Sequence, residues 1–182
     1  VRIIPEIACI QVGDTLSLEA EARDQYNNIV DEVVIDWWVS NNTIGTLNQT
    51  SGKYVNLTAG TTPDYICVYA TTGMYTGFAM IAIIPGNVDY IILNPTNVSI
   101  TVGEWLQFEA QAYDIYHNPI VDMQSSPTIP PWNGSGQEPF YPPSPAVPPI
   151  EPEYYWNVIG DIGYLNGDIQ NVVEFVANNY PG

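Results

Sequence analysis

Carboxylates, amides and two thiols are the groups in this sequence that could do chemistry. The chain of 182 residues holds 20 Asp and Glu, two Cys and a single His, His117. A Ser-His-Asp triad needs a His that an acid holds in a cleft, but His117 falls in a turn-like run, residues 114–118. No motif singles out a pair of acids suited to glycoside hydrolysis. We therefore predict that the chain is not an enzyme.

Oxygen ligands gather in two similar turns. The first turn contains Asp24 and Asn28, and the second contains Asp114 and Asn118. Carboxylate and amide oxygens at this spacing suit calcium. The alternative is that each Asp closes its own turn through side-chain-to-backbone hydrogen bonds. Calcium is the only cofactor that the sequence leaves open, because one His and two Cys do not provide a usual zinc site.

The composition limits the partners. The formal net charge is -17, with only three Lys and Arg, and hydrophobic residues make up 46% of the chain. Binding to nucleic acid or to anionic lipid needs clustered basic residues, so we expect neither. The longest apolar run, residues 78–84, has seven residues, whereas a membrane-spanning helix needs about 20. We expect a folded chain with no membrane span and little helix.

N-glycosylation has a statistical basis. Five sequons stand at Asn41, Asn48, Asn56, Asn97 and Asn133, where chance at this composition gives about two. Glycans on these residues would place the chain outside the cell. The alternative is that Asn and Thr are simply common in turns.

The two thiols, Cys9 and Cys67, leave several outcomes open. An even count in a chain that looks exported favours a disulfide. The alternation of the flanking apolar residues turns both Cys outward, and a disulfide needs Cα atoms within about 7 Å. An internal disulfide, an intermolecular bond and free thiols are all compatible with the sequence.

An internal repeat organises the chain. At an offset of 90, eleven of 30 positions are identical, from Pro5 on Pro95 to Asn28 on Asn118. The match resumes at an offset of 118, so the second copy carries an insertion of 28 residues. The insertion lies within 124–153, which holds ten of the sixteen prolines and predicts a polyproline-like surface arm. We predict two domains, 1–86 and 87–182.

Each copy has the pattern of a β-sandwich. Residues 15–23 and 105–113 alternate between apolar and polar side chains, which is typical of half-buried antiparallel strands. Seven short strands in the first copy favour an immunoglobulin-like (Ig-like) sandwich. We expect Trp38 and its counterpart Trp156 to be core residues.

The second copy stops short of the first. Gly182 aligns with Asp64, so the last two strands of the first copy have no counterpart. The fold class predicted is therefore all-β, with two tandem Ig-like sandwiches, the second incomplete. Either the chain is cut from a longer one, or another chain supplies the missing strands.

The order of the motifs resembles the bacterial Ig-like (Big, invasin/intimin-type) repeats of prokaryotic cell-surface, adhesin and S-layer proteins. The matching motifs are Val12-Gly13, Asp24-x-Tyr26-x-Asn28, Trp38-x-Ser40, Ile44-Gly45-Thr46-Leu47, Ser51-Gly52 and Ala59-Gly60-Thr61. The resemblance covers the first copy and most of the second, and the Pro-rich segment departs from it. It implies an extracellular, cell-surface protein.

The leading hypothesis is a non-enzymatic structural subunit of a cell-surface filament or S-layer, with copies of itself or other surface-layer proteins as partners. Strand complementation would join the copies. An archaeal source is a guess from the composition. The alternative is an adhesin or carbohydrate-binding module that uses Trp132, Phe140 and Tyr141 of the Pro-rich segment and binds glycans. An accessory domain of an enzyme is the third hypothesis.

Overall fold

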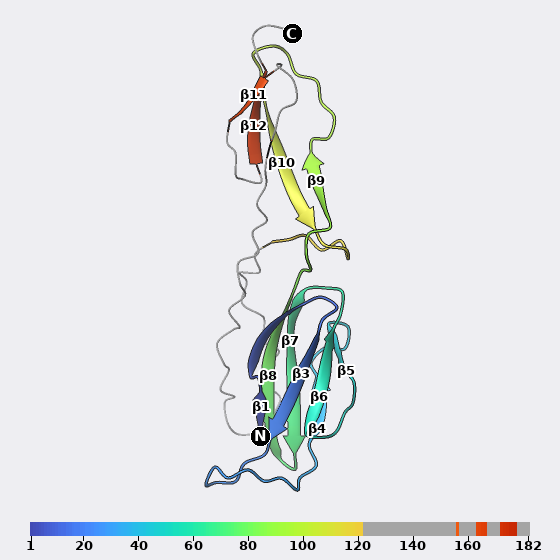
Figure 1. Cartoon of the computed structure of the whole chain (residues 1–182), viewed down its shortest axis with the longest axis vertical. Helices are drawn as coiled ribbons and strands as arrows, with labels where there is room; N and C mark the ends of the chain where they lie inside the picture. The colour runs from blue at the N-terminus through green and yellow to red at the C-terminus, as the bar shows by residue number, and fades with distance from the viewer. Residues whose placement is uncertain (122–155, 157–162, 167–171, 178–182) are drawn as a thin grey trace. The chain divides into compact units, whose positions relative to one another are not determined.

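The computed structural model describes residues 1–121, 156, 163–166 and 172–177. These residues form strands and no helix, in two compact units that divide between Pro85 and Gly86 (Figure 1). The strands of the first unit are β1 (Arg2–Ile4), β2 (Ile7–Gln11), β3 (Thr15–Glu21), β4 (Asp36–Val39), β5 (Gly45–Leu47), β6 (Tyr54–Ala59), β7 (Asp64–Thr72) and β8 (Tyr75–Ile84). Those of the second unit are β9 (Tyr90–Asn94), β10 (Trp105–Tyr113), β11 (Gly163–Asn166) and β12 (Val172–Ala177). The predicted arm, 124–153, lies outside the described residues.

The first unit is a two-sheet sandwich, as the sequence predicts. One sheet has the order β1-β3-β6-β5, and the other has the order β2-β8-β7-β4. All pairings are antiparallel except that of β2 with β8, which is parallel. In β3 and β6 every second side chain is apolar and faces the other sheet, since Leu18 and Val55 are register partners and both are buried.

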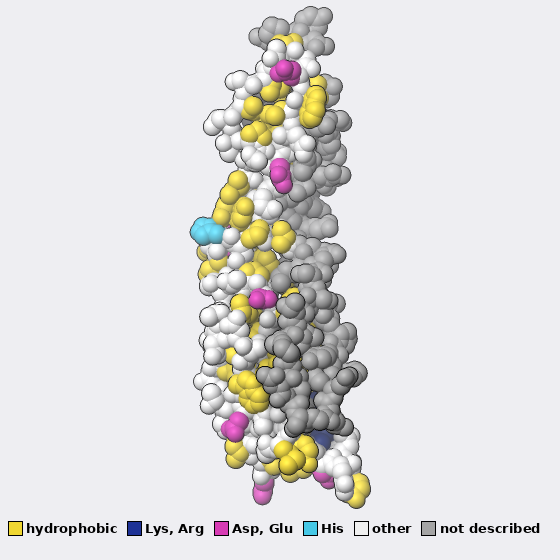
Figure 2. Space-filling view, turned by 180° about the vertical axis from the view of Figure 1, so that it is seen from behind, with side chains coloured by type: hydrophobic (Ala, Val, Ile, Leu, Met, Phe, Trp, Pro, Cys, Tyr) yellow, Lys and Arg dark blue, Asp and Glu magenta, His cyan; other side chains and the backbone are white. Residues whose placement is uncertain are grey.

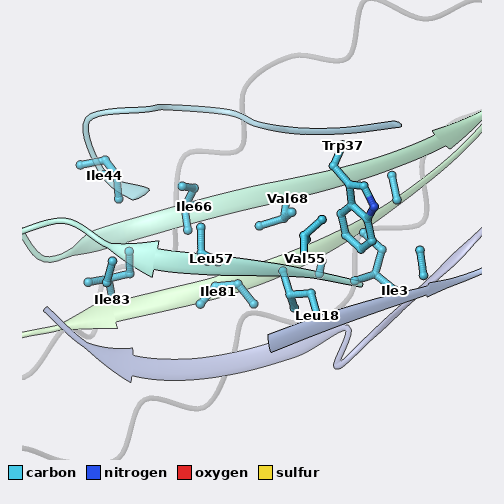
Figure 3. Close-up of a cluster of buried hydrophobic side chains, with 14 of the residues drawn as sticks. Ile3, Leu18, Trp37, Ile44, Val55, Leu57, Ile66, Val68, Ile81 and Ile83 are labelled. Carbon is cyan, nitrogen blue, oxygen red and sulfur yellow. The ribbon is translucent and has the colours of Figure 1, made fainter. Parts of the chain in front are cut away.

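The core lies between these two sheets (Figure 3). Side chains that are completely buried there come from both sheets: Ile3, Leu57, Ile66, Val68, Ile81 and Ile83. Trp37 is 2% exposed and lies beside Ile3, and its indole Nε1 donates a hydrogen bond to the Gly52 carbonyl at 2.7 Å. This bond satisfies the one polar atom that burying an indole would leave without a partner.

The prediction that Trp38 is a core residue is wrong. Trp38 is 45% exposed and points away from the core, which Trp37 occupies instead. Residues 33–39 are apolar at both parities apart from Asp36, so alternation alone does not say which Trp faces inward. In the second unit, Trp156 is half-buried and packs against the small cluster of Ala110, Ala112 and Ile120.

The described part of the second unit forms one sheet, β9-β10-β12-β11. This sheet repeats the first unit's β1-β3-β6-β5 sheet strand by strand and in the same register. The pair Leu18↔Val55 becomes Phe108↔Val173, and the pair Gly45↔Ala59 becomes Gly163↔Ala177. Both offsets of the sequence repeat, 90 and 118, are therefore reproduced in the strand pairing.

The second sheet of the first unit has no equivalent among the described residues of the second. By the offset of 118, counterparts of β7 and β8 would begin at Gly182. The counterpart of β2, residues 97–101, is described and is not a strand. In the first unit β2 pairs only with β8, and among the described residues no strand pairs with residues 97–101.

Candidate functional site

The first of the two predicted metal turns is closed by its own hydrogen bonds. Asp24 Oδ1 accepts from the backbone N–H of Tyr26 at 2.8 Å and of Asn28 at 2.9 Å, and Oδ2 accepts from Asn28 Nδ2 at 3.1 Å. These bonds, led by that of the Asn28 side chain, lower the pKa of Asp24. The turn is exposed to solvent.

Asp114, the counterpart of Asp24, is completely buried. Its Oδ1 accepts from the backbone N–H of Tyr116 and of Asn118, and Oδ2 accepts from Asn118 Nδ2 and from the backbone N–H of Gly86, each at 2.9 Å. Burial raises the pKa of Asp114, but the hydrogen bonds from Asn118, Gly86 and Tyr116 outweigh it, so the net pKa is lowered. Asp114 thus ties its turn to the residue that follows the first unit.

The geometry of these turns does not fit calcium. Both oxygens of each carboxylate already face N–H donors, whose partial positive charge is directed at the place a cation would need. The described residues contain no group of three or more Asp, Glu, His or Cys that could hold a metal. A turn closed by its own Asp accounts for the hydrogen bonds of the Asp24 side chain, and for those of the Asp114 side chain apart from the bond with Gly86.

His117 occupies a turn position. Its φ of 66° matches the 69° of Asn27, its counterpart in the first turn. It is exposed, and Nδ1 lies 2.8 Å from the Tyr90 hydroxyl. None of its described contacts is with a carboxylate that would make it a general base.

The two cysteines are free thiols on one face of the β2-β8-β7-β4 sheet. Cys9 pairs in register with Ala82, and Cys67 pairs with Met80, so β8 lies between the two strands that carry them. Two strand spacings of about 4.8 Å separate these strands, more than the separation of about 7 Å that a disulfide allows. An internal disulfide is therefore excluded. Burial raises the pKa of both thiols.

Four of the five sequons lie on described residues, and their Asn side chains are exposed: Asn41, Asn48, Asn56 and Asn97. Asn41 Oδ1 accepts from both the backbone N–H and the hydroxyl of Thr43, the third residue of its sequon. Asn48 and Asn56 also accept hydrogen bonds through Oδ1, whereas a glycan is joined to Nδ2. Asn133 lies outside the described residues. Modification of these sites stays a prediction.

The outer face of the β2-β8-β7-β4 sheet is also apolar, and we call it the apolar outer face. The alternation of apolar and polar residues in the sequence did not identify it. Its members are Ile7, Cys9, Trp38, Tyr65, Cys67, Tyr69, Phe78, Met80, Ala82 and Ile84. Trp38 stacks on Tyr69 with ring centroids 5.3 Å apart, and Tyr69 lies 6.3 Å from Phe78. The sequence did carry a sign of this face, because residues 78–84 are apolar at both parities.

The second unit leaves inward positions of its sheet uncovered. Leu93 is 37% exposed where its counterpart Ile3 is 0% exposed, and Val102 is 46% exposed where Val12 is 7% exposed. Figure 2 shows hydrophobic side chains gathered on the surface of this unit. Leu93 and Val102 are therefore exposed although their counterparts lie in the core of the first unit, while Ala110 and Ala112 stay buried as their counterparts do.

Comparison with known proteins places the fold. No family model and no curated protein matches the sequence. Among solved structures, the Escherichia coli adhesin FdeC matches all of this chain and 55% of its own, with a TM-score of 0.51 and 16% identity. The S-layer protein SbsC matches 68% of this chain and 17% of its own (TM-score 0.41, 13% identity). The Yersinia pseudotuberculosis adhesin InvE matches 61% of this chain and 33% of its own (TM-score 0.40, 21% identity).

This chain thus spans from about a sixth to about half of these solved chains. The described residues include no helix that could cross a membrane. The match to FdeC confirms the all-β, Ig-like class predicted from the sequence. The chain has the Ig-like fold of bacterial cell-surface domains, in agreement with its resemblance to the Big-type repeats.

Proposed function

We propose that the chain is a non-enzymatic structural subunit of an extracellular cell-surface assembly, and that strands from outside residues 1–182 complete its second sandwich. The observation that carries the proposal is the contrast between equal positions in the two units. Leu93 and Val102 are exposed where Ile3 and Val12 are buried, although the sheets agree in order and register. A cover that the first unit has is missing over the same side chains in the second.

The first unit defines what the cover must be. There, β7 and β8 form an antiparallel pair in the middle of the second sheet, and this pair joins β2 on one side to β4 on the other. A donor for the second unit is therefore a pair of adjacent strands whose alternate side chains are apolar, as Ile66, Val68 and Ile81 are in β7 and β8. Its outer strand would pair in parallel with residues 97–101, as β8 pairs with β2.

The structure argues against one donor that the sequence suggests, the opening segment of a neighbouring copy. Residues 2–4 already pair with β3 and residues 7–11 already pair with β8 of their own unit. Ile3 is completely buried in that core. Donating this segment would open the first sandwich in order to close the second. The polypeptide beyond Gly182, or a strand pair of another subunit, has no such cost.

The test adds the missing hairpin covalently. Residues 65–84 are appended directly after Gly182, which the repeat aligns with Asp64. We expect amide hydrogen exchange in residues 90–113 to slow, because the added strands bury Leu93 and pair with residues 97–101. A matched control carries the same extension with Val68 and Ile81 of the appended copy replaced by Asp. If both extensions leave exchange in 90–113 unchanged, the second unit is not an acceptor of strands and the proposal is wrong.

Native material identifies the source of the donor. A native polypeptide that is heavier than 20.1 kDa plus glycans, and whose peptide map contains residues after Gly182, would show that the same chain supplies the donor. A chain near that mass that forms polymers, and that loses them when the hairpin is appended, would show donation by a neighbour. The exposed sequons at Asn41, Asn48, Asn56 and Asn97 suit either arrangement at the cell surface.

An adhesin is the second candidate, and the likeness to FdeC over the whole chain favours it. An adhesin would bind cells or glycans as a purified monomer, with no need to polymerise. Binding to a glycan array or to cells that persists in the hairpin-extended chain would favour this function over a structural one.

A further inference from the structure

The central residues of the apolar outer face are buried although neither sheet of the sandwich covers them. Met80 is 1% exposed, Ala82 is 0% exposed and Cys67 is 7% exposed, yet all three point away from the core between the sheets. The strands β1, β3, β6 and β5 lie on the opposite side of their sheet. Burial to this degree in the middle of an outer sheet face requires a further layer.

The other outer face of the same sandwich shows what an uncovered face looks like here. On β3 and β6 the outward residues Ser17, Asn56 and Thr58 are polar and exposed, and Ser17 Oγ donates to Asn56 Oδ1 at 2.8 Å. The two outer faces thus differ in chemistry, one polar and the other aromatic and aliphatic. The polar face on β3 and β6 suits contact with water, whereas the apolar outer face suits contact with a partner.

We propose that the Pro-rich segment of this chain, residues 124–153, docks on the apolar outer face as a polyproline-type arm. Prolines fix the extended, left-handed polyproline conformation before binding, so less conformational entropy is lost, and aromatic-lined surfaces are the usual receptors of such segments. Trp38, Tyr69 and Phe78 provide a row of rings for it. The segment has three charged residues, Glu138, Glu151 and Glu153, and Asp36 on the edge strand β4 is the one charged residue among the outward strand residues of this sheet.

The Pro-rich segment begins close to the end of β8 along the chain's hydrogen-bonded path. Gly86, two residues after the end of β8, donates its N–H to Asp114 in the turn that precedes the segment. The Ile120 N–H donates to the Ala112 carbonyl, which holds the chain at this turn until just before the segment begins. The segment therefore starts near the end of the strand whose outer face needs cover.

The segment is long enough to cover the face and return. β8 has ten residues, or roughly 33 Å at 3.3 Å per residue. Thirty residues of polyproline helix span roughly 93 Å, more than twice that length. The Asn133-Gly134 pair, with Ser135 and Gly136 after it, interrupts the prolines and is typical of a turn. The first stretch, residues 124–132, spans roughly 28 Å, close to the length of β8.

The two native thiols provide the test, because both lie on this face. The full chain is compared with a variant that lacks residues 124–151, the 28 residues that the second copy has in excess of the first. We expect the Cys67 thiol to react with a maleimide roughly tenfold faster or more in the variant, since its cover is gone. Cys9→Ser and Cys67→Ser variants assign the signal to each thiol.

A second variant keeps the length of the chain. It replaces the ten prolines, Trp132, Phe140 and Tyr141 of the segment by Gly and Ser, so the connection to the second unit is unchanged, and it should raise the Cys67 rate as the deletion does. Asn133→Gln is the matched control and should leave the rate unchanged. A synthetic peptide of residues 124–153, added to the deletion variant, should slow the reaction again.

Three results would overturn the proposal. Cys67 that reacts as fast in the full chain as in urea would show an uncovered face. Protection that survives in both variants would show that another part of the molecule covers it. Protection that rises with protein concentration would show that a second copy, and not the arm, is the occupant.

Discussion

Replacing Asp114 by Asn tests whether a charged hydrogen-bond acceptor stabilises the turn at residues 114–118. Asp114 takes four N–H donors in a fully buried place, and an Asn of nearly the same shape has one oxygen and one NH₂ in their place. Its oxygen can keep the two backbone bonds of Tyr116 and Asn118. Its NH₂ then faces the Gly86 N–H, which loses its acceptor.

The magnitude follows from the lost bonds. A buried donor without a partner costs about 1 to 3 kcal/mol, and hydrogen bonds to a charged group contribute about 1.5 to 3 kcal/mol. Asn118 can turn its amide to offer Oδ1 to the new NH₂, so its side-chain bond is not lost entirely. We expect Asp114→Asn to lower the free energy of unfolding of the second unit by about 2 to 3 kcal/mol at pH 7.

Hydrogen exchange measured by mass spectrometry is the assay, because it reports on both turns in one molecule. Residues 105–121 should exchange faster in Asp114→Asn, while residues 15–31 keep their rate. Asp24→Asn is the matched control, since its turn has the same local bonds but lies in water and has no bond to a residue such as Gly86. Its effect on residues 15–31 should be smaller than that of Asp114→Asn on residues 105–121.

Acid should remove the difference between wild type and Asp114→Asn. Because the pKa of Asp114 is lowered in the folded chain, its contribution is complete above the unfolded pKa of about 3.9. It is lost as the pH falls through the folded pKa. The difference in stability between the two proteins should therefore begin to shrink below about pH 4 and should vanish below the folded pKa. Equal stability at pH 7, or a gap that persists in acid, would refute the reasoning.

Three further predictions concern the other residues of the candidate sites. Trp37→Ala should destabilise the first unit by about 3 to 5 kcal/mol in urea unfolding, whereas Trp38→Ala should cost about 0.5 to 1.5 kcal/mol for its stacking on Tyr69; the reverse order would contradict the strand parity. Peptide mapping of native protein should find glycans at several of the exposed sequons, and unmodified Asn at all of them would remove the support for an exported coat. Calcium or EDTA should leave the melting temperature unchanged, and a rise with calcium would show a site that the bonds of Asp24 and Asp114 do not predict.

Repetition made much of the fold predictable. Aligning the chain with itself yields the offsets of 90 and 118, and the strand pairing of the two units follows both residue by residue. Local alternation correctly placed β3 and β10, since a one-residue slip in register would turn their apolar residues to water.

In strands that have apolar residues at both odd and even positions, the sequence did not show which residues face the core. Trp37 and Trp38 are adjacent, and only the strand's position against β7 decides which of them enters the core. Likewise, Met80 and Ile81 are both buried, one in the core and one on the apolar outer face. Alternation marks one buried face, so a strand that is covered on both sides looks like a short continuous apolar run.

Identical local sequence also did not fix burial at the turns. Asp24 and Asp114 share the motif Asp-x-Tyr-x-Asn and the same local bonds. They differ because Gly86 donates to Asp114, a contact between residues 28 positions apart. This hydrogen bond is a tertiary contact, so the residues of the motif alone do not predict it.

In the second unit, assembly with a donated strand pair would itself contribute to stability. Burying a side chain such as Leu93 or Val102 contributes about 1.5 to 3 kcal/mol each, and a whole domain has a net stability of about 5 to 15 kcal/mol. A donated strand pair that covers both residues would therefore supply a large share of that stability. If a neighbouring copy donates it, the melting temperature of the second unit should rise with protein concentration, because the donor binds the folded state alone. If the same polypeptide donates it, the melting temperature of the longer chain should not depend on concentration. A melting temperature of residues 1–182 that is high and independent of concentration would show instead that the single sheet is stable as it stands, and strand donation would lose its physical basis.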